Sequence, residues 1–192
     1  MKFWGVDLGG TKIECTVIEG EETLIRRRIP TEAEKGYEHI ISQVTKLVGE
    51  VSAEIQMSPE RIGFATPGVL DPETGLMKNC NTVSMNGEPM NKDLENALRV
   101  PVKIANDANC FALAETIMGA GKNYPHAELV FGIIMGTGVG GGLVVHNRIV
   151  EGVHSIAGEW ELNLREENGA ACHCGKRGCV ETVISGVALE NH

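Results

Sequence analysis

In the segment Asp7-Leu8-Gly9-Gly10-Thr11-Lys12, a glycine pair separates two apolar runs, residues 3–8 and residues 13–18. Two apolar runs separated by a glycine pair predict a β-hairpin with a glycine-rich turn. Backbone N–H groups approach phosphate oxygens closely only where no Cβ intervenes, and glycine also supplies the positive φ of a tight turn. The segment is therefore compatible with a turn that binds phosphate.

A second glycine-rich segment, Met135-Gly136-Thr137-Gly138-Val139-Gly140-Gly141-Gly142, has similar surroundings, with apolar runs at residues 129–135 and 143–145. Neither segment has the Gly-Lys-Ser/Thr of a Walker A loop, and neither has the strand-to-helix context in which the Gly-x-Gly-x-x-Gly of dinucleotide folds occurs. Each alone could be an ordinary glycine hairpin. Together they favour a nucleotide whose phosphates are held between two lobes.

Composition narrows the class of protein. The chain has 192 residues, of which 42% are hydrophobic and 22% charged, as is typical of a globular protein. Its formal net charge of −9 argues against a nucleic-acid partner. No apolar segment is long enough to span a bilayer, and the N-terminus lacks the pattern of a signal peptide. We expect a cytoplasmic protein that acts on a small molecule.

The order of predicted elements indicates an α/β fold with two lobes. Helical periodicity and short apolar runs predict a β-meander followed by alternating helices and strands, which is typical of a sheet with helices packed on it. This first lobe spans residues 1–120, and a partial second lobe spans residues 121–192. The predicted strands cover residues 3–8, 13–18, 23–29, 62–65 and 102–105, and the helices residues 40–55, 92–98 and 108–118.

Asn106-Asp107-Ala108-Asn109 lies where a predicted strand is followed by a helix. Asp107 is either the N-cap of that helix, a position that favours aspartate, or a general base at the carboxyl end of a strand, where ligands of α/β proteins collect. The two interpretations are compatible, because a helix N-terminus favours the ionised carboxylate that a base needs.

Side-chain amides and carboxylates are available for a polyol. Asn79, Asn81 and Asn86 lie in a long turn-rich stretch, and Glu159 lies in a second loop. Such groups offer the paired donors and acceptors that sugar hydroxyls require. The alternative is that they are turn asparagines and a surface glutamate.

Three of the six cysteines cluster as Cys172, Cys174 and Cys179. Such a cluster in a reducing compartment favours a metal site over disulfides, and zinc requires four tetrahedral ligands. Gly175 and Gly178 allow the tight turns that would wrap a metal. The other three cysteines are scattered, and we expect them to be small core residues.

Taken together, these segments resemble the ROK family of repressors, uncharacterised open reading frames and sugar kinases. The resemblance covers nearly the whole chain, and the loop at residues 79–87 is most similar to the fructokinase and N-acetylhexosamine-kinase branch. It implies the actin-like (ribonuclease H-like) ATPase fold. The segments that carry it, in order, are residues 7–12, 65–68, 106–109, 136–142, 157–159 and 172–181.

The resemblance implies an ATP-dependent kinase that phosphorylates a hexose hydroxyl. Asp107 would take the proton from the attacking hydroxyl. The sugar would be bound by Asn81, Asn106, Glu159 and Glu181. The ATP phosphates would be bound by Gly9, Gly10, Thr11 and Lys12 from one lobe and by Gly136, Thr137 and Gly138 from the other. Mg²⁺ would bridge the phosphates near Asp7, and a structural Zn²⁺ would bind Cys172, Cys174 and Cys179.

One departure from the family concerns the motif Glu-x-Gly-His, whose histidine contacts sugar and zinc in family members. Here Glu159 is followed by Trp160-Glu161-Leu162, without a histidine. A fourth zinc ligand would then be water or one of His154, His173, Glu161 and His192.

A second departure is length, since family members continue well beyond residue 192. We expect an incomplete second lobe whose apolar surface is covered by a second copy or by a partner chain. The alternative function is a catalytically impaired homologue that binds a sugar or a partner. A sugar-responsive repressor would need an N-terminal helix-turn-helix, for which the segment before Gly9 leaves no room.

Overall fold

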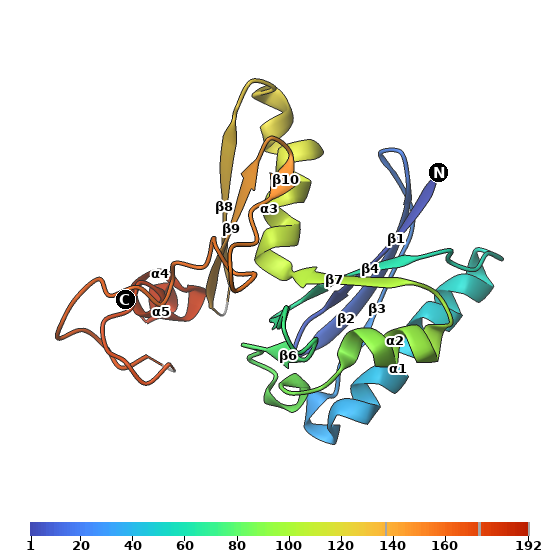
Figure 1. Cartoon of the computed structure of the whole chain (residues 1–192), viewed down its shortest axis with the longest axis horizontal. Helices are drawn as coiled ribbons and strands as arrows, with labels where there is room; N and C mark the ends of the chain where they lie inside the picture. Colours follow the sequence, from blue (N-terminus) through green and yellow to red (C-terminus); the bar gives the residue numbers. More distant parts are fainter. Residues whose placement is uncertain (137, 173, 192) are drawn as a thin grey trace. The chain divides into compact units, whose positions relative to one another are not determined.

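The computed structural model describes residues 1–136, 138–172 and 174–191 (Figure 1). The chain divides into two compact units, Met1–Asp107 and Ala108–His192. The division falls at Asp107 and not near residue 120, so that the helix after Asp107 belongs to the second unit. The functional assignment of the two lobes stays a prediction.

The first unit is built on a five-stranded sheet with the order β3-β2-β1-β4-β7. Strands β1, β2 and β3 form the predicted antiparallel meander, while β4 and β7 run parallel to β1. The strand bounds are β1 (Lys2–Leu8), β2 (Lys12–Glu19), β3 (Glu22–Pro30), β4 (Ile62–Thr66) and β7 (Val102–Asn106).

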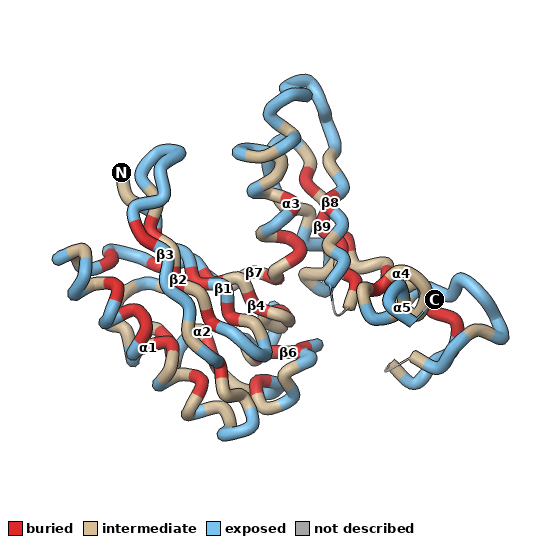
Figure 2. The backbone as a smooth tube through the Cα atoms, turned by 180° about the vertical axis from the view of Figure 1, so that it is seen from behind, coloured by how far each residue is buried: buried red, intermediate tan, exposed pale blue. Residues whose placement is uncertain are grey.

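Helices α1 (Tyr37–Glu54) and α2 (Met90–Leu98) lie on the same face of this sheet (Figure 1). Their buried apolar residues form one core with buried residues of the strands. Figure 2 colours the buried positions red. The stretch between β4 and α2 contains the short elements β5 (Val69–Leu70), β6 (Met77–Lys78) and η2 (Val83–Met85), and η1 (Ala33–Lys35) precedes α1.

Helix α1 has the apolar periodicity that the sequence indicates. Its buried residues follow the 3.6-residue period and all face the sheet: Ile40, Val44, Leu47, Val48 and Val51. Burying a side chain of this size stabilises the fold by about 1.5–3 kcal/mol relative to leaving it in water. Burial, more than helix propensity, therefore fixes α1 on the sheet.

The second unit contains a three-stranded antiparallel sheet with the order β10-β9-β8. Helix α3 begins at the boundary between the units, and two short helices end the chain. The bounds are α3 (Asp107–Ile117), η3 (Ala120–Asn123), β8 (Leu129–Met135), β9 (Val139–Val145), β10 (Arg148–Ile149), α4 (Glu181–Ile184) and α5 (Gly186–Glu190).

The expectation that the whole second glycine run forms a turn is wrong, because β9 begins at Val139 and includes the last three glycines. A Cβ on Gly142 would lie 2.5 Å from the Ala108 carbonyl oxygen. A Cβ on Gly132 of β8 would lie 2.7 Å from the Ala112 Cβ. These strand glycines therefore allow α3 to pack closely on the β8–β9 hairpin.

Within the described ranges, no helix has both the length and the apolar composition that crossing a membrane requires.

Candidate functional site

The carboxyl ends of three parallel strands meet at one edge of the first unit's sheet. Asp7 of β1 is in register with Ala65 of β4, which is in register with Ala105 of β7. The next pair is Thr66 with Asn106. Adjacent strands lie about 4.8 Å apart, so the segments that follow these strands are neighbours. Ligands of α/β proteins collect at such an edge.

The first glycine turn, residues 9–12, follows β1 at this edge. It is closed by a hydrogen bond from the Gly9 N–H to the Lys12 carbonyl, 2.9 Å. The Thr31 hydroxyl donates to the Gly9 carbonyl at 2.7 Å, and the Thr31 N–H donates to the Thr11 carbonyl at 3.0 Å. Sequence reasoning missed Thr31, because no motif marks it.

The expectation of positive φ in this turn is wrong, since neither Gly9 nor Gly10 lies in the left-handed region. A Cβ at position 10 would lie 2.8 Å from the Thr82 Oγ1, so a larger residue there would require the Thr82 side chain to shift. The loop expected to bind sugar therefore contacts the first glycine turn.

Asn86 of that loop has a structural role. Its side-chain oxygen accepts from the Cys80 N–H and its amide donates to the Cys80 carbonyl, both at 2.9 Å. Asn81 is exposed in the same loop, so its side chain is accessible to a ligand. A sugar role for Asn81 stays a prediction.

Two carboxylates lie next to each other beside the first turn. Asp7 and Glu14 are cross-strand partners on β1 and β2. Partial burial, followed by the Glu14 charge, raises the pKa of Asp7. Glu14 is already ion-paired with Arg26 and Arg28, whereas Asp7 offers carboxylate oxygens of the kind that Mg²⁺ prefers. The donor set therefore fits the magnesium site expected near Asp7.

Asn106, the last residue of β7, and Asp107, which follows it, lie at the same edge. Asn106 ends the strand with 4% exposure, and the half-buried Asp107 is the first residue of α3. A helix N-terminus favours the ionised form of a carboxylate in its first turn. A role of Asp107 as a general base stays a prediction.

In the second unit, Glu181 lies against the second glycine turn. Its Oε2 accepts from the Val139 N–H at 3.2 Å, and a Cβ on Gly138 would lie 2.7 Å from the same oxygen. The Gly136 N–H donates to the Gly138 carbonyl at 2.8 Å. Thr137 lies outside the described residues. A carboxylate expected to bind sugar is therefore in contact with a turn expected to bind phosphate.

The segment that replaces the family's Gly-His is partly buried. Trp160 makes an edge-to-face contact with Phe131, with ring centroids 6.0 Å apart. Glu161 is only 6% exposed, and in the described part of the chain neither its Oε2 nor the Trp160 Nε1 has a hydrogen-bond partner. Glu159 is half-buried, and its N–H donates to the Ile156 carbonyl at 3.1 Å.

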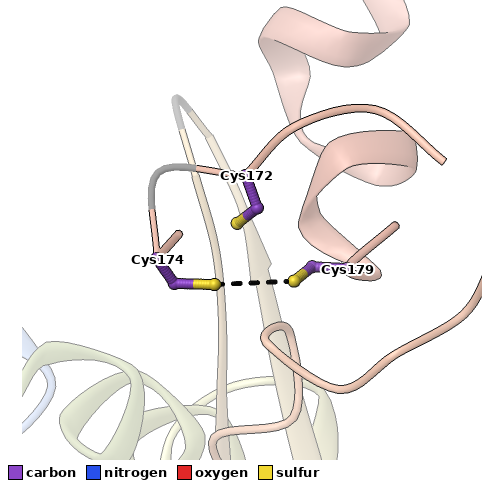
Figure 3. Close-up of side chains that lie close together, drawn as sticks. All are labelled: Cys172, Cys174 and Cys179. Atoms are coloured by element: carbon purple, nitrogen blue, oxygen red, sulfur yellow. Dashed lines mark hydrogen bonds between the residues drawn. The ribbon is translucent and has the colours of Figure 1, made fainter. Parts of the chain in front are cut away.

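Figure 3 shows the three clustered cysteine side chains pointing toward one another. Their Sγ atoms all lie within 4.8 Å of each other, and those of Cys174 and Cys179 are 3.6 Å apart. A tetrahedral zinc site with Zn–S bonds of about 2.3 Å places sulfur atoms about 3.8 Å apart. The cluster therefore fits three ligands of a zinc ion.

The loop around the cluster is shaped by two glycines with positive φ, Gly175 at 86° and Gly178 at 69°. A hydrogen bond from the Lys176 N–H, as the largest influence, lowers the pKa of the Cys174 thiol. Burial raises the pKa of the Cys179 thiol to about 12. Binding of a metal would have to displace that proton.

The fourth ligand is not found among the described residues. Of the four protein candidates, His154 and Glu161 do not lie with the three sulfur atoms. The other two, His173 and His192, lie outside the described residues.

Comparisons with known proteins identify the family of the chain. The sequence profile of the ROK family matches residues 3–192. The N-acetyl-D-glucosamine kinase of Pectobacterium atrosepticum is 36% identical over 98% of this chain, which spans 64% of that enzyme's length.

Two solved structures extend the comparison to the fold. A ROK hexokinase from Thermus thermophilus has a TM-score of 0.82 and 35% identity over 100% of this chain and 62% of its own. A ROK family glucokinase from Streptomyces griseus, in complex with glucose and AMPPNP, has a TM-score of 0.86 and 30% identity over 100% of this chain and 59% of its own. The fold is thus the actin-like ATPase fold expected from the sequence, over the part that this chain spans.

Proposed function

The chain belongs to the ROK family, and from this premise we propose that it carries the catalytic edge of an ATP-dependent hexose kinase. The substrate we propose is a glucose-type or N-acetylated hexose, since relatives are named for N-acetyl-D-glucosamine and glucose. Fructose is a further candidate substrate, because the loop at residues 79–87 resembles the fructokinase and N-acetylhexosamine-kinase branch. The chain spans about 64% of the length of the Pectobacterium atrosepticum kinase, so the kinase activity is proposed for this chain.

The observation that supports this function best is the register of the three parallel strands. It brings the Asp7 end of β1, with the first glycine turn, to the same sheet edge as Asn106 and Asp107. Phosphoryl transfer depends mainly on positioning and charge neutralisation, both of which this edge can supply. Asp107 would accept the proton of the attacking sugar hydroxyl.

The remaining roles follow the family pattern. Asn81, Asn106, Glu159 and Glu181 would bind sugar hydroxyls. The backbone of Gly9, Gly10, Thr11, Gly136, Thr137 and Gly138 and the side chain of Lys12 would bind phosphates. Mg²⁺, held near Asp7, would neutralise phosphate charge. Zn²⁺ on Cys172, Cys174 and Cys179 would be structural.

We propose that a second copy of the chain covers the second unit's open strand edge. Strand β8 is the last strand in its sheet, where backbone groups are available for pairing. Next to this edge, on one face of the sheet, four alternate residues of β8 are exposed and apolar, namely Leu129, Phe131, Ile133 and Met135. Light scattering should give twice the chain mass, and a monomer at every concentration would contradict the proposal.

The kinase proposal is tested by ADP release in a coupled assay with a panel of hexoses. The panel comprises glucose, mannose, fructose, N-acetylglucosamine and N-acetylmannosamine, each with MgATP. We expect turnover with at least one of them. No turnover with any, from a chain that is folded by circular dichroism, would contradict the proposal.

A second candidate function is a sugar- or partner-binding module without catalysis. It is favoured by Trp160-Glu161-Leu162 in place of the family's histidine segment, and by the buried Glu161 oxygen without a partner among the described residues. Calorimetry would then detect sugar binding without MgATP binding, whereas measurable turnover excludes this candidate.

A further inference from the structure

We propose that Thr31 is a positioning residue that holds the first glycine turn in its phosphate-binding conformation. The inference rests on the proposed function for the role of the turn, but its structural basis is independent of that function. Thr31 follows β3 and is 1% exposed. It is a polar side chain in the core whose hydrogen-bonding capacity is directed at this turn.

Thr31 contacts the turn at two peptide groups. Its hydroxyl donates to the Gly9 carbonyl and its backbone N–H donates to the Thr11 carbonyl. A third bond, from the Gly9 N–H to the Lys12 carbonyl, closes the hairpin. Two of these three bonds therefore come from one residue that is distant in sequence.

The hydroxyl bond has a consequence for anion binding. The peptide between Gly9 and Gly10 is trans and planar, so its C=O and N–H point in opposite directions. With the Gly9 carbonyl directed at Thr31, the Gly10 N–H is directed away from Thr31. The Thr31 hydroxyl thus engages a carbonyl that would repel phosphate and orients a donor that would attract it.

The residue after Thr31 is itself constrained. Glu32 has the left-handed backbone conformation, φ 52° and ψ 46°, which is unfavourable for a non-glycine residue. Its carboxylate lies 2.7 Å from the Lys35 Nζ and 2.7 Å from the His39 Nε2. Because His39 belongs to α1, these contacts tie the chain next to Thr31 to the helix layer.

The test compares Thr31→Val, which removes the hydroxyl at nearly constant volume, with Thr31→Ser, which keeps it. The matched control is Thr45→Val, because the Thr45 hydroxyl donates to the Ile41 carbonyl at 2.8 Å within α1, outside the turn. Two quantities are measured for each folded variant. They are the hydrogen-exchange rate of the Gly9 amide and the affinity for MgATP by calorimetry, with KM for ATP and for sugar where turnover is found.

Loss of one neutral hydrogen bond corresponds to about a fivefold change in an equilibrium constant. We expect Thr31→Val to accelerate Gly9 amide exchange and to weaken MgATP binding by about that factor. KM for the sugar should stay within about twofold of the wild type, and Thr31→Ser and Thr45→Val should stay within about twofold in every measurement.

Unchanged exchange in Thr31→Val, or an equal effect of Thr45→Val, would overturn the inference. Faster exchange with unchanged MgATP affinity would overturn its link to phosphate binding. A wild-type chain that does not bind MgATP would contradict the proposed function instead, while the exchange rates would still decide whether Thr31 holds the turn.

Discussion

The Glu181 carboxylate accepts a hydrogen bond from the Val139 N–H at 3.2 Å, which joins the start of α4 to the second glycine turn. A second hydrogen bond, which joins two backbone groups, runs from the Gly186 N–H to the Gly136 carbonyl at 2.7 Å. It connects the start of α5 to the same turn. The C-terminal helices and the turn therefore form one local structure within the second unit.

Glu181→Ala should lower the free energy of unfolding of this unit by about 1.5 kcal/mol, because a bond to a charged acceptor is lost and the Val139 N–H is left without it. Glu181→Gln should cost less, since its side-chain oxygen can still accept. Urea denaturation measures both. Equal stability of Glu181→Ala and the wild type would contradict this prediction, because it would mean that water can replace the carboxylate as the partner of the Val139 N–H.

Gly142→Ala should destabilise the protein by about 1–3 kcal/mol, because the new Cβ would lie 2.5 Å from the Ala108 carbonyl oxygen and 2.8 Å from the Ala112 Cβ. The matched control is Gly49→Ala in α1, where a Cβ meets nothing within 4 Å. That control should raise stability by up to about 1 kcal/mol, because alanine is the better helix former. Thermal unfolding of the two variants should shift in opposite directions.

The protein purified without chelator should contain about one zinc ion per chain, because three thiolates at this separation supply most of a tetrahedral site. Cys179→Ser should lose most of the metal, whereas Cys110→Ser, outside the cluster, should keep it. Elemental analysis of the three proteins measures this. A wild-type content far below one per chain would remove the zinc proposal.

Asp71 should contribute acid-sensitive stability. A hydrogen bond from Lys78 and those from the Thr74 and Glu73 N–H groups hold the pKa of Asp71 well below its usual range. A group with a lowered folded-state pKa stabilises the fold above its unfolded pKa, which is about 3.9, and loses that contribution as the pH falls toward the folded value. The stability difference between wild type and Asp71→Asn should thus be constant from about pH 5 to pH 7 and shrink below about pH 4. A stability difference that grows as the pH falls would contradict the prediction, because it would mean that folding raises the pKa of Asp71.

Local patterns predicted the main strands and helices of the first unit. The glycine pair after β1 and the apolar spacing in α1 predict elements whose ends lie within a few residues of those observed. The cysteine spacing likewise predicts a cluster that the structure brings together. Each of these signals is contained in a short segment, so tertiary contacts were not needed to read it.

What the sequence could not supply depends on contacts between distant segments. Gly140 to Gly142 look like turn residues, yet they lie in β9, where Gly140 and Gly142 face α3 and Gly141 faces Gly158 and Trp160. Thr31 and Glu181 acquire their roles from carbonyl and N–H groups far away in sequence. Asn86 looks like a sugar ligand until its bonds to Cys80 are seen.

The central claim is that Asp107, at the carboxyl edge of the first unit's sheet, accepts the proton of a sugar hydroxyl during transfer from ATP. The most direct measurement follows sugar-phosphate formation by phosphorus NMR with the wild type and Asp107→Asn, with MgATP affinity determined for both. The account predicts a rate lowered by about 10²–10⁴ in Asp107→Asn with MgATP affinity within about twofold. Equal rates in the two proteins, or no sugar phosphate from a wild-type chain that binds both MgATP and sugar, would contradict it.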